Sequence, residues 1–178
     1  MTRILALSGS LRALSSNTAI LRVAALVAPA GTHIEVHPGL DLLPYFNPDL
    51  DRELDDPVLP IPVRALRHAL GASDALLISS PEYAHGVCGM MKNALDWLVG
   101  GEEMVHKPVG AINTSPHAMH AWSAMLETLR TMTADVVEGA CVPIAVPRDR
   151  GDAELASDPA VAEPLRTALA RLTEATRR

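Results

Sequence analysis

Short apolar runs alternate along the chain with longer stretches in which apolar residues recur every three or four positions. The first run, Arg3–Ser8, predicts a buried strand, and Ile20, Val23 and Val27 then follow at the spacing of one helix face. The run Ala75–Ile78 is wholly apolar, which is typical of a parallel strand covered on both faces. The pattern therefore predicts strands that alternate with amphipathic helices.

Extended along the sequence, this pattern predicts five strands and five helices. We expect the strands at Arg3–Ser8, His33–His37, Ala75–Ile78, Val109–Asn113 and Cys141–Val146. We expect the helices at about Asn17–Ala28, Val58–Leu70, Gly86–Val99, His120–Thr133 and Ala160–Thr176. Strict alternation implies an α/β fold with a parallel sheet and right-handed crossovers. A length of 178 residues suits a single domain over residues 1–178.

The position of a ligand depends on the order of the strands in the sheet. Two doubly wound orders are common, and the sequence alone does not choose between them. For five strands in a chain of this length we favour the flavodoxin-like order 2-1-3-4-5. In that order a ligand crevice lies beyond the carboxyl ends of the first and third strands, so the loops after these strands are the candidate site.

The loop after the first strand carries the donors that a phosphate group requires. They are the hydroxyls of Ser10, Ser15, Ser16 and Thr18, the amide of Asn17 and the guanidinium of Arg12. A helix start adds free N–H groups and the positive end of the helix dipole. The alternative is ordinary capping by Ser15, Ser16 or Asn17, and the loop alone gives the two interpretations about equal weight. Its place at the expected crevice favours phosphate. The loop has neither Gly-Lys-Ser/Thr nor GxGxxG, so a mononucleotide is a better ligand than ATP or NAD.

The loop after the third strand offers a surface for a flat ring. Tyr83 is one of five aromatic residues in the chain and could stack on such a ring, although packing against a neighbouring loop is the alternative. Glu82 could act through its side chain or its backbone N–H, and His85 could orient a substrate or simply be solvated. The sequence suggests no Ser-His-Asp triad, Cys-His pair or paired carboxylates. This is typical of a protein whose bound cofactor carries the chemistry.

Composition and charge narrow the choice of partners. The net charge is −6 and the chain has no block of Lys and Arg, which argues against nucleic acid or an anionic membrane. The apolar run Ile4–Leu7 is too short for a signal peptide or a membrane span. Cys88 and Cys141 lie far apart without CxxC or Cys/His clustering, so we expect no metal site and a reduced, cytoplasmic protein.

At its two candidate loops the chain resembles the NADPH-dependent FMN reductase family, which includes bacterial quinone and chromate reductases. The matching segments are Gly9-Ser10-Leu11-Arg12-x-x-Ser15-x-Asn17, Pro44-Tyr45-Phe46-Asn47-Pro48-Asp49, Pro81-Glu82-Tyr83 and Lys92-Asn93-Ala94-x-Asp96-Trp97. The resemblance covers roughly residues 3 to 135. It implies a flavodoxin-like fold with bound FMN, and NADPH or NADH as electron donor. It further implies a small-molecule acceptor and a homodimer or homotetramer, with Tyr45, Phe46 and Trp97 near the subunit contact; simple core packing is the alternative for Trp97.

The resemblance assigns roles to individual residues. It implies FMN phosphate contacts from Ser10, Arg12, Ser15 and Asn17, to which the loop composition adds Ser16 and Thr18. It implies ring contacts from Pro81, Glu82 and Tyr83. Ala84 stands where many relatives have Asn, and Thr114–His120 replaces a glycine-rich loop, within which Ser115 could still reach the FMN.

Three functions are compatible with this fold class. The first is an enzyme that passes hydride from NAD(P)H through FMN to a quinone, flavin or similar acceptor. The second is a flavodoxin-type electron carrier, which is usually more acidic and flanks the flavin with two aromatic residues. The third is a phospho-acceptor signalling domain, which would need acidic residues at the end of the first strand, where Leu7–Ser10 has none. The sequence favours the enzyme, with FMN and not a side chain as the reactive group.

Overall fold

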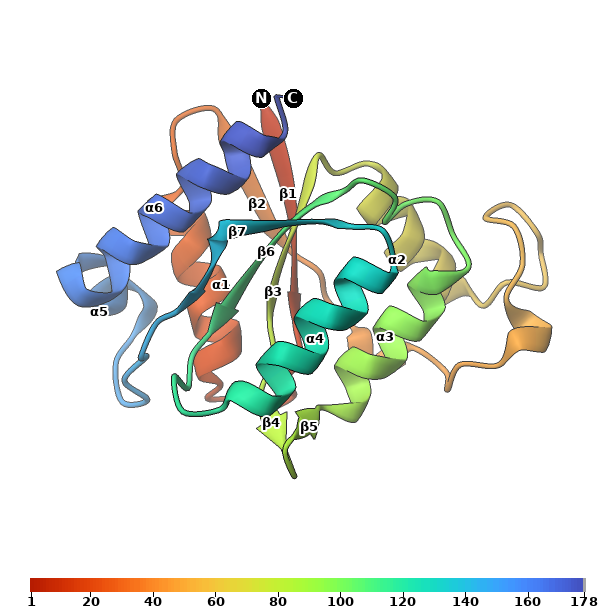
Figure 1. Ribbon diagram of the computed structural model, residues 1–178, viewed down its shortest axis with the longest axis horizontal. Coiled ribbons are helices and arrows are strands. Elements are labelled where there is room, and N and C mark those ends of the chain that lie inside the picture. The colour runs from red at the N-terminus through yellow and green to blue at the C-terminus, as the bar shows by residue number, and fades with distance from the viewer. Residues whose placement is uncertain (178) are drawn as a thin grey trace.

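A five-stranded parallel sheet separates two layers of helices in the computed structural model, which describes residues 1–177 (Figure 1). The strand order is β2-β1-β3-β6-β7, and every neighbouring pair is parallel. Because β4 and β5 form a separate hairpin, this order is the predicted 2-1-3-4-5 arrangement, and the flavodoxin-like prediction is confirmed.

The elements have the following bounds. The strands are β1 (Thr2–Ser8), β2 (Thr32–Val36), β3 (Ala75–Ser79), β4 (Glu82–Tyr83), β5 (Gly86–Val87), β6 (Pro108–Asn113) and β7 (Asp135–Pro143). The α-helices are α1 (Ser16–Val27), α2 (Ile61–Gly71), α3 (Gly89–Val99), α4 (Met119–Thr131), α5 (Asp152–Ser157) and α6 (Pro159–Ala175). Two short 3₁₀ helices, η1 (Leu40–Leu42) and η2 (Pro48–Leu50), lie in the connection between β2 and α2.

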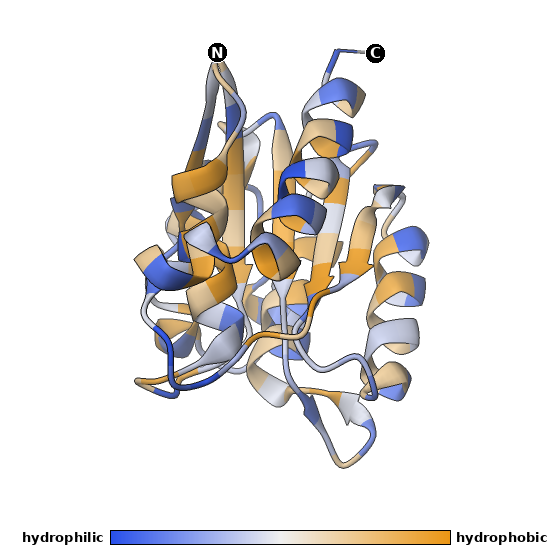
Figure 2. Ribbon diagram, turned by 90° about the vertical axis from the view of Figure 1, so that its left-hand side faces the viewer, coloured by the Kyte–Doolittle hydropathy of each residue, from blue (hydrophilic) through white to orange (hydrophobic). Residues whose placement is uncertain are grey.

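The sheet buries both of its faces, as the apolar runs predict. Alternate residues of β1 point to opposite layers, so Leu5 and Leu7 pack with α2, α3 and α4, whereas Ile4 and Ala6 pack with α1, α5 and α6. Every residue of the central strand β3 is buried. Figure 2 shows the apolar residues concentrated along the strands and the inward sides of the helices.

The predicted bounds of α3 and β7 were wrong, each for a local reason, and α2 begins at Ile61, three residues after its predicted start. Helix α3 begins at Gly89 instead of Gly86, because the residues before it pair antiparallel as β4 and β5. Strand β7 is Asp135–Pro143 instead of Cys141–Val146. It lies at the edge of the sheet, and exposed residues such as Glu138 interrupt its apolar pattern. The short helix α5 was not predicted at all.

Helix α3 holds the long connection after β2 against the sheet. Its Asn93 amide donates to Pro44 O (2.9 Å) and accepts from Phe46 N (2.8 Å), and the Trp97 indole also donates to Pro44 O (2.8 Å). The Phe46 ring meets Trp97 edge-on, with 5.1 Å between ring centroids. Trp97 is completely buried, so the core alternative holds for Trp97, while Tyr45 is 92% exposed.

No helix within residues 1–177 is both long enough and apolar enough to cross a membrane.

Candidate functional site

A cleft opens at the carboxyl ends of the central strands, at the lower edge of the sheet in Figure 1. It encloses about 560 Å³, including the part open to solvent. The loops after β1, β3, β6 and β7 all contribute to it. Its lining residues are Ser10, Arg12, Leu14, Ser15, Ser16, Asn17, Pro81, Glu82, Tyr83, Thr114, Ser115, Ala118 and Arg148.

Asn17 connects three of the loops at the base of the cleft. Its side-chain oxygen accepts hydrogen bonds from the hydroxyls of Ser79 (2.9 Å), the last residue of β3, and Thr114 (3.2 Å), which follows β6. Asn17 is only 8% exposed, and its amide nitrogen has no acceptor among residues 1–177. The two hydroxyls hold the amide in place, and its two N–H donors are left for a bound group.

The start of α1 serves both as a capped helix end and as a source of donors. Ser15 is the N-cap, and its hydroxyl accepts from Thr18 N (3.3 Å). The backbone N–H groups of Ser16 and Asn17 find no protein acceptor within the described chain. Capping by Ser15 thus leaves donors at the positive end of the helix dipole, where an anion is favoured. The Thr18 hydroxyl is bonded to Ser8 (2.7 Å), and Thr18 is not among the lining residues.

The β4–β5 hairpin forms the opposite wall of the cleft. Its two central residues, Ala84 (φ 50°) and His85 (φ 58°), both lie in the left-handed region, as in the tight turns that suit antiparallel hairpins. Tyr83 lines the cleft and is 57% exposed, whereas Ala84 is at the tip of the hairpin and does not line it. A large, exposed aromatic ring at the rim is available to a flat ligand.

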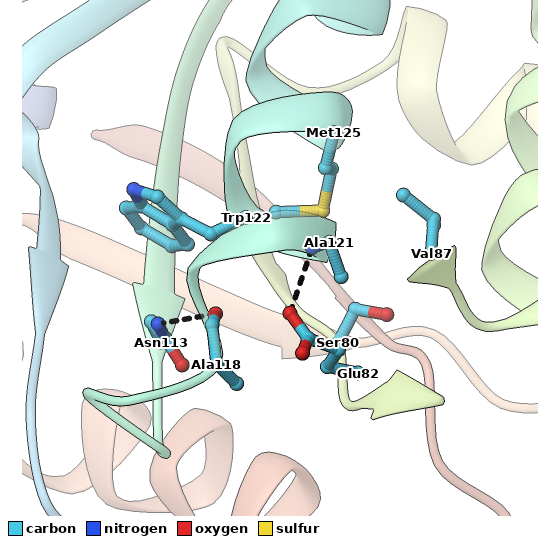
Figure 3. Close-up of a pocket in the computed structure, with 8 residues that line it drawn as sticks. All are labelled: Ser80, Glu82, Val87, Asn113, Ala118, Ala121, Trp122 and Met125. Atoms are coloured by element: carbon cyan, nitrogen blue, oxygen red, sulfur yellow. Dashed lines mark hydrogen bonds between the residues drawn. The ribbon is translucent and has the colours of Figure 1, made fainter. Parts of the chain in front are cut away.

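Two contacts join this hairpin to the start of α4. The Glu82 carboxylate accepts from Ala121 N (2.8 Å), so its side chain caps α4. Figure 3 shows this bond together with the one from the Asn113 amide to Ala118 O (3.1 Å). Both lie at a small pocket beside the hairpin, which Trp122 and Met125 also line. The sequence left open whether Glu82 acts through its side chain or its backbone N–H. Its side chain is already engaged within the protein by the bond to Ala121 N.

The second contact is between two histidines. The rings of His85 and His120 stack with centroids 4.3 Å apart and planes at 20°. Because His120 lies in the first turn of α4, the stack holds the hairpin tip against this helix. Neither histidine is among the residues that line the cleft.

The structure brings together most of the residues predicted from the sequence. Nine of them line the cleft, namely Ser10, Arg12, Ser15, Ser16, Asn17, Pro81, Glu82, Tyr83 and Ser115; Thr18 and Ala84 do not. Sequence reasoning missed Leu14, Thr114, Ala118 and Arg148. A signal existed for Thr114 and Arg148, because each follows a strand whose carboxyl end lies at the same edge of the sheet.

Comparisons with known proteins point to one family. Residues 2–149 match the family model described as NADPH-dependent FMN reductase. An NAD(P)H-dependent FMN reductase of Pseudomonas aeruginosa is 37% identical over 95 residues, which are 53% of this chain and 49% of that protein. A quinone reductase of Escherichia coli K12 is 32% identical over 109 residues, or 60% of this chain and 56% of that protein. The chain therefore spans about half the length of these curated relatives.

Solved structures confirm the fold. A flavoenzyme NAD(P)H:acceptor oxidoreductase from Paracoccus denitrificans superposes with a TM-score of 0.76 at 24% identity, over 99% of this chain and 98% of that one. An oxidoreductase from Corynebacterium diphtheriae gives a TM-score of 0.66 at 22% identity, over 98% of both chains. Since the family model covers most of the sequence and matches the loops that form the cleft, the chain belongs to the NADPH-dependent FMN reductase family.

Proposed function

We propose that this protein is an FMN-dependent NAD(P)H oxidoreductase that reduces a quinone, a flavin or a similar small acceptor. The observation that carries the proposal is the donor set of the cleft. Arg12, the free N–H groups at the start of α1 and the unpaired amide of Asn17 line the same space as the exposed ring of Tyr83. A phosphate at one end and a flat ring at the other are what these groups can recognise.

The donors fit a phosphate monoester better than a dinucleotide. Backbone N–H groups and a guanidinium can share its oxygens, and α1 adds a favourable dipole. Ser79 and Thr114 hold the Asn17 amide from below, so it can donate without having to reorient. Pro81 and Tyr83 line the wall where the flavin ring would lie.

The protein's own part in the reaction is to bind and position. FMN supplies the hydride-transfer chemistry when it is bound. The Glu82 carboxylate holds α4 through Ala121 N and thereby fixes the hairpin that carries Tyr83. Because Tyr83 is exposed, that side of the cleft is open to electron donors and electron acceptors of different shapes. This agrees with the different electron acceptors, FMN and quinone, in the names of the relatives. Assembly as a homodimer or homotetramer and a reduced, cytoplasmic setting stay predictions from the sequence.

The deciding experiment is anaerobic mixing of the FMN-loaded protein with NADPH and, separately, with NADH. We expect one donor to bleach the flavin absorbance rapidly, while free FMN without protein is reduced far more slowly under the same conditions. A bound flavin that neither donor bleaches would instead favour the flavodoxin-type electron carrier. Failure of the protein to bind FMN would contradict the proposal altogether.

A further inference from the structure

Arg148 reaches the cleft from a loop that lies outside the sequence motifs described above. It follows β7, which is the edge strand, and it lines the cleft together with Arg12 and Ser15. It also lines a second, adjoining pocket between the start of α1 and the loop that leads into α5, so it stands where the two spaces meet.

The neighbouring arginines are engaged, whereas Arg148 is available. Arg22 forms an ion pair with Asp152, and Arg150 pairs with Glu154 and Asp158. Arg148 is exposed and pairs with no carboxylate in the part of the chain that the structure describes, and the same is true of Arg12. The cleft therefore has two unpaired guanidinium groups, on loops more than a hundred residues apart in the sequence.

The charges around these two arginines favour a doubly charged anion. Glu82 is the one carboxylate among the lining residues, and its side chain already accepts from Ala121 N. The start of α1 adds its dipole and the free N–H groups of Ser16 and Asn17. In a protein with a net charge of −6, this cleft is a local concentration of positive groups.

We propose that Arg148 is a second phosphate-binding arginine, which contacts the FMN phosphate from the loop after β7 while Arg12 contacts it from the loop after β1. The proposal rests on the FMN binding proposed above. Two guanidinium groups without competing carboxylates bind the phosphate most strongly as its dianion, the form that prevails above about pH 6. Arg148 thus contributes to the choice of a phosphorylated flavin over riboflavin, which has the same ring and no phosphate.

The test compares FMN with riboflavin on the flavin-free protein, titrated by the quenching of flavin fluorescence. Arg148→Ala is expected to weaken FMN binding by about 10- to 100-fold, the loss of one charge-assisted contact, and to leave riboflavin affinity within about twofold. Arg148→Lys should recover part of the loss, because it restores the charge without the planar donors. The FMN defect of Arg148→Ala should shrink below pH 6 as the phosphate takes up a proton.

Arg150→Ala is the matched control, since Arg150 lies on the same loop but is held by Glu154 and Asp158. It should bind FMN like the unmodified protein, and unchanged thermal unfolding of Arg148→Ala would exclude a folding defect. Equal FMN affinity in Arg148→Ala and Arg150→Ala would overturn the role of Arg148, as would a parallel loss for FMN and riboflavin. If the unmodified protein bound no FMN, the proposed function itself would fail, which is a different result from either of these.

Discussion

Asn17 shows how a single side chain can belong both to the scaffold and to the cleft. Its oxygen is occupied by the hydroxyls of Ser79 and Thr114, which are 62 and 97 positions away in the sequence, while its amide nitrogen stays free. The sequence indicated a ligand contact for Asn17 from its place in a motif. It could not indicate the partners, because hydrogen bonds between loops depend on the strand order and not on local pattern.

At Gly9 the loop after β1 packs closely against the loop after β3. Gly9 is buried, and its N–H donates to Ser79 O (2.8 Å). A Cβ added at Gly9 would clash with Ser80 Oγ and would lie 2.9 Å from Ser80 Cβ and 3.0 Å from Cys88 Sγ. Only a residue without a side chain fits this approach.

We therefore expect Gly9→Ala to lower the free energy of unfolding by about 1 to 3 kcal/mol, the usual cost of overpacking. It should also weaken FMN binding, because the two loops must move apart. Urea denaturation and a flavin titration measure the two effects. Gly89→Ala is the control, since a Cβ there meets no atom within 4 Å, and it should be close to neutral. Equal stability of the two variants would contradict the close approach at Gly9.

The β4–β5 hairpin is the element that the sequence pattern concealed. Its strands are two residues each, too short to show an alternation, so the segment merged with the helical pattern that follows. The turn also uses Ala84 and His85 at positive φ, where Asn or Gly would be expected. Elements with a clear apolar signal, such as the periodic helix α1 and the wholly apolar strand β3, were predicted within one or two residues of their bounds.

Strain at this turn leads to a prediction for Ala84. Asn tolerates the left-handed conformation better than Ala does, so Ala84→Asn should raise the free energy of unfolding by about 0.5 to 1 kcal/mol. Ala145→Asn serves as the control, since Ala145 is exposed in a loop and is not at positive φ. Urea denaturation of both variants is the measurement, with amide hydrogen exchange of residues 82–87 as a local readout. No gain for Ala84→Asn over its control would show that the turn stores no such strain.

At the scale of the whole molecule, an ion-pair cluster ties the long connection after β2 to the helical layer. Arg67 of α2 is 5% exposed, pairs with Glu103 (3.0 Å) and Asp51 (3.6 Å) and donates to Arg52 O (3.0 Å). The second oxygen of Glu103 is buried and has no hydrogen-bond partner among residues 1–177. The strands could be predicted because their apolar runs are local, and their order followed from the arrangement that is common for five strands in a chain of this length. This cluster joins segments with no pattern of their own.

Removing Arg67 should destabilise the whole fold. Arg67→Met leaves the largely buried carboxylate of Glu103 (side chain 11% exposed) without its ion-pair partner, and we expect a loss of about 3 to 5 kcal/mol in the free energy of unfolding. The double variant Arg67→Met with Glu103→Gln should regain part of this loss, since Glu103 then carries no charge and only Asp51 is left without Arg67. Arg130→Met, whose partner Glu127 is 4.0 Å away on the surface, is the control and should change stability by less than about 0.5 kcal/mol. A loss for Arg67→Met as small as that of the control would refute the role of the cluster.

The edge strand β7 also bears on how copies of this protein meet in a crowded solution. An open sheet edge offers unpaired backbone groups to any other extended chain, and such pairing can grow into aggregates. Along β7 the exposed residues include the acidic Asp135 and Glu138, and its register with β6 shifts between Val109 and Ala111. Like charges repel when two such edges approach, and the irregular register spoils a continuous ladder. These two features of β7 therefore disfavour the pairing of another chain with this edge of the sheet.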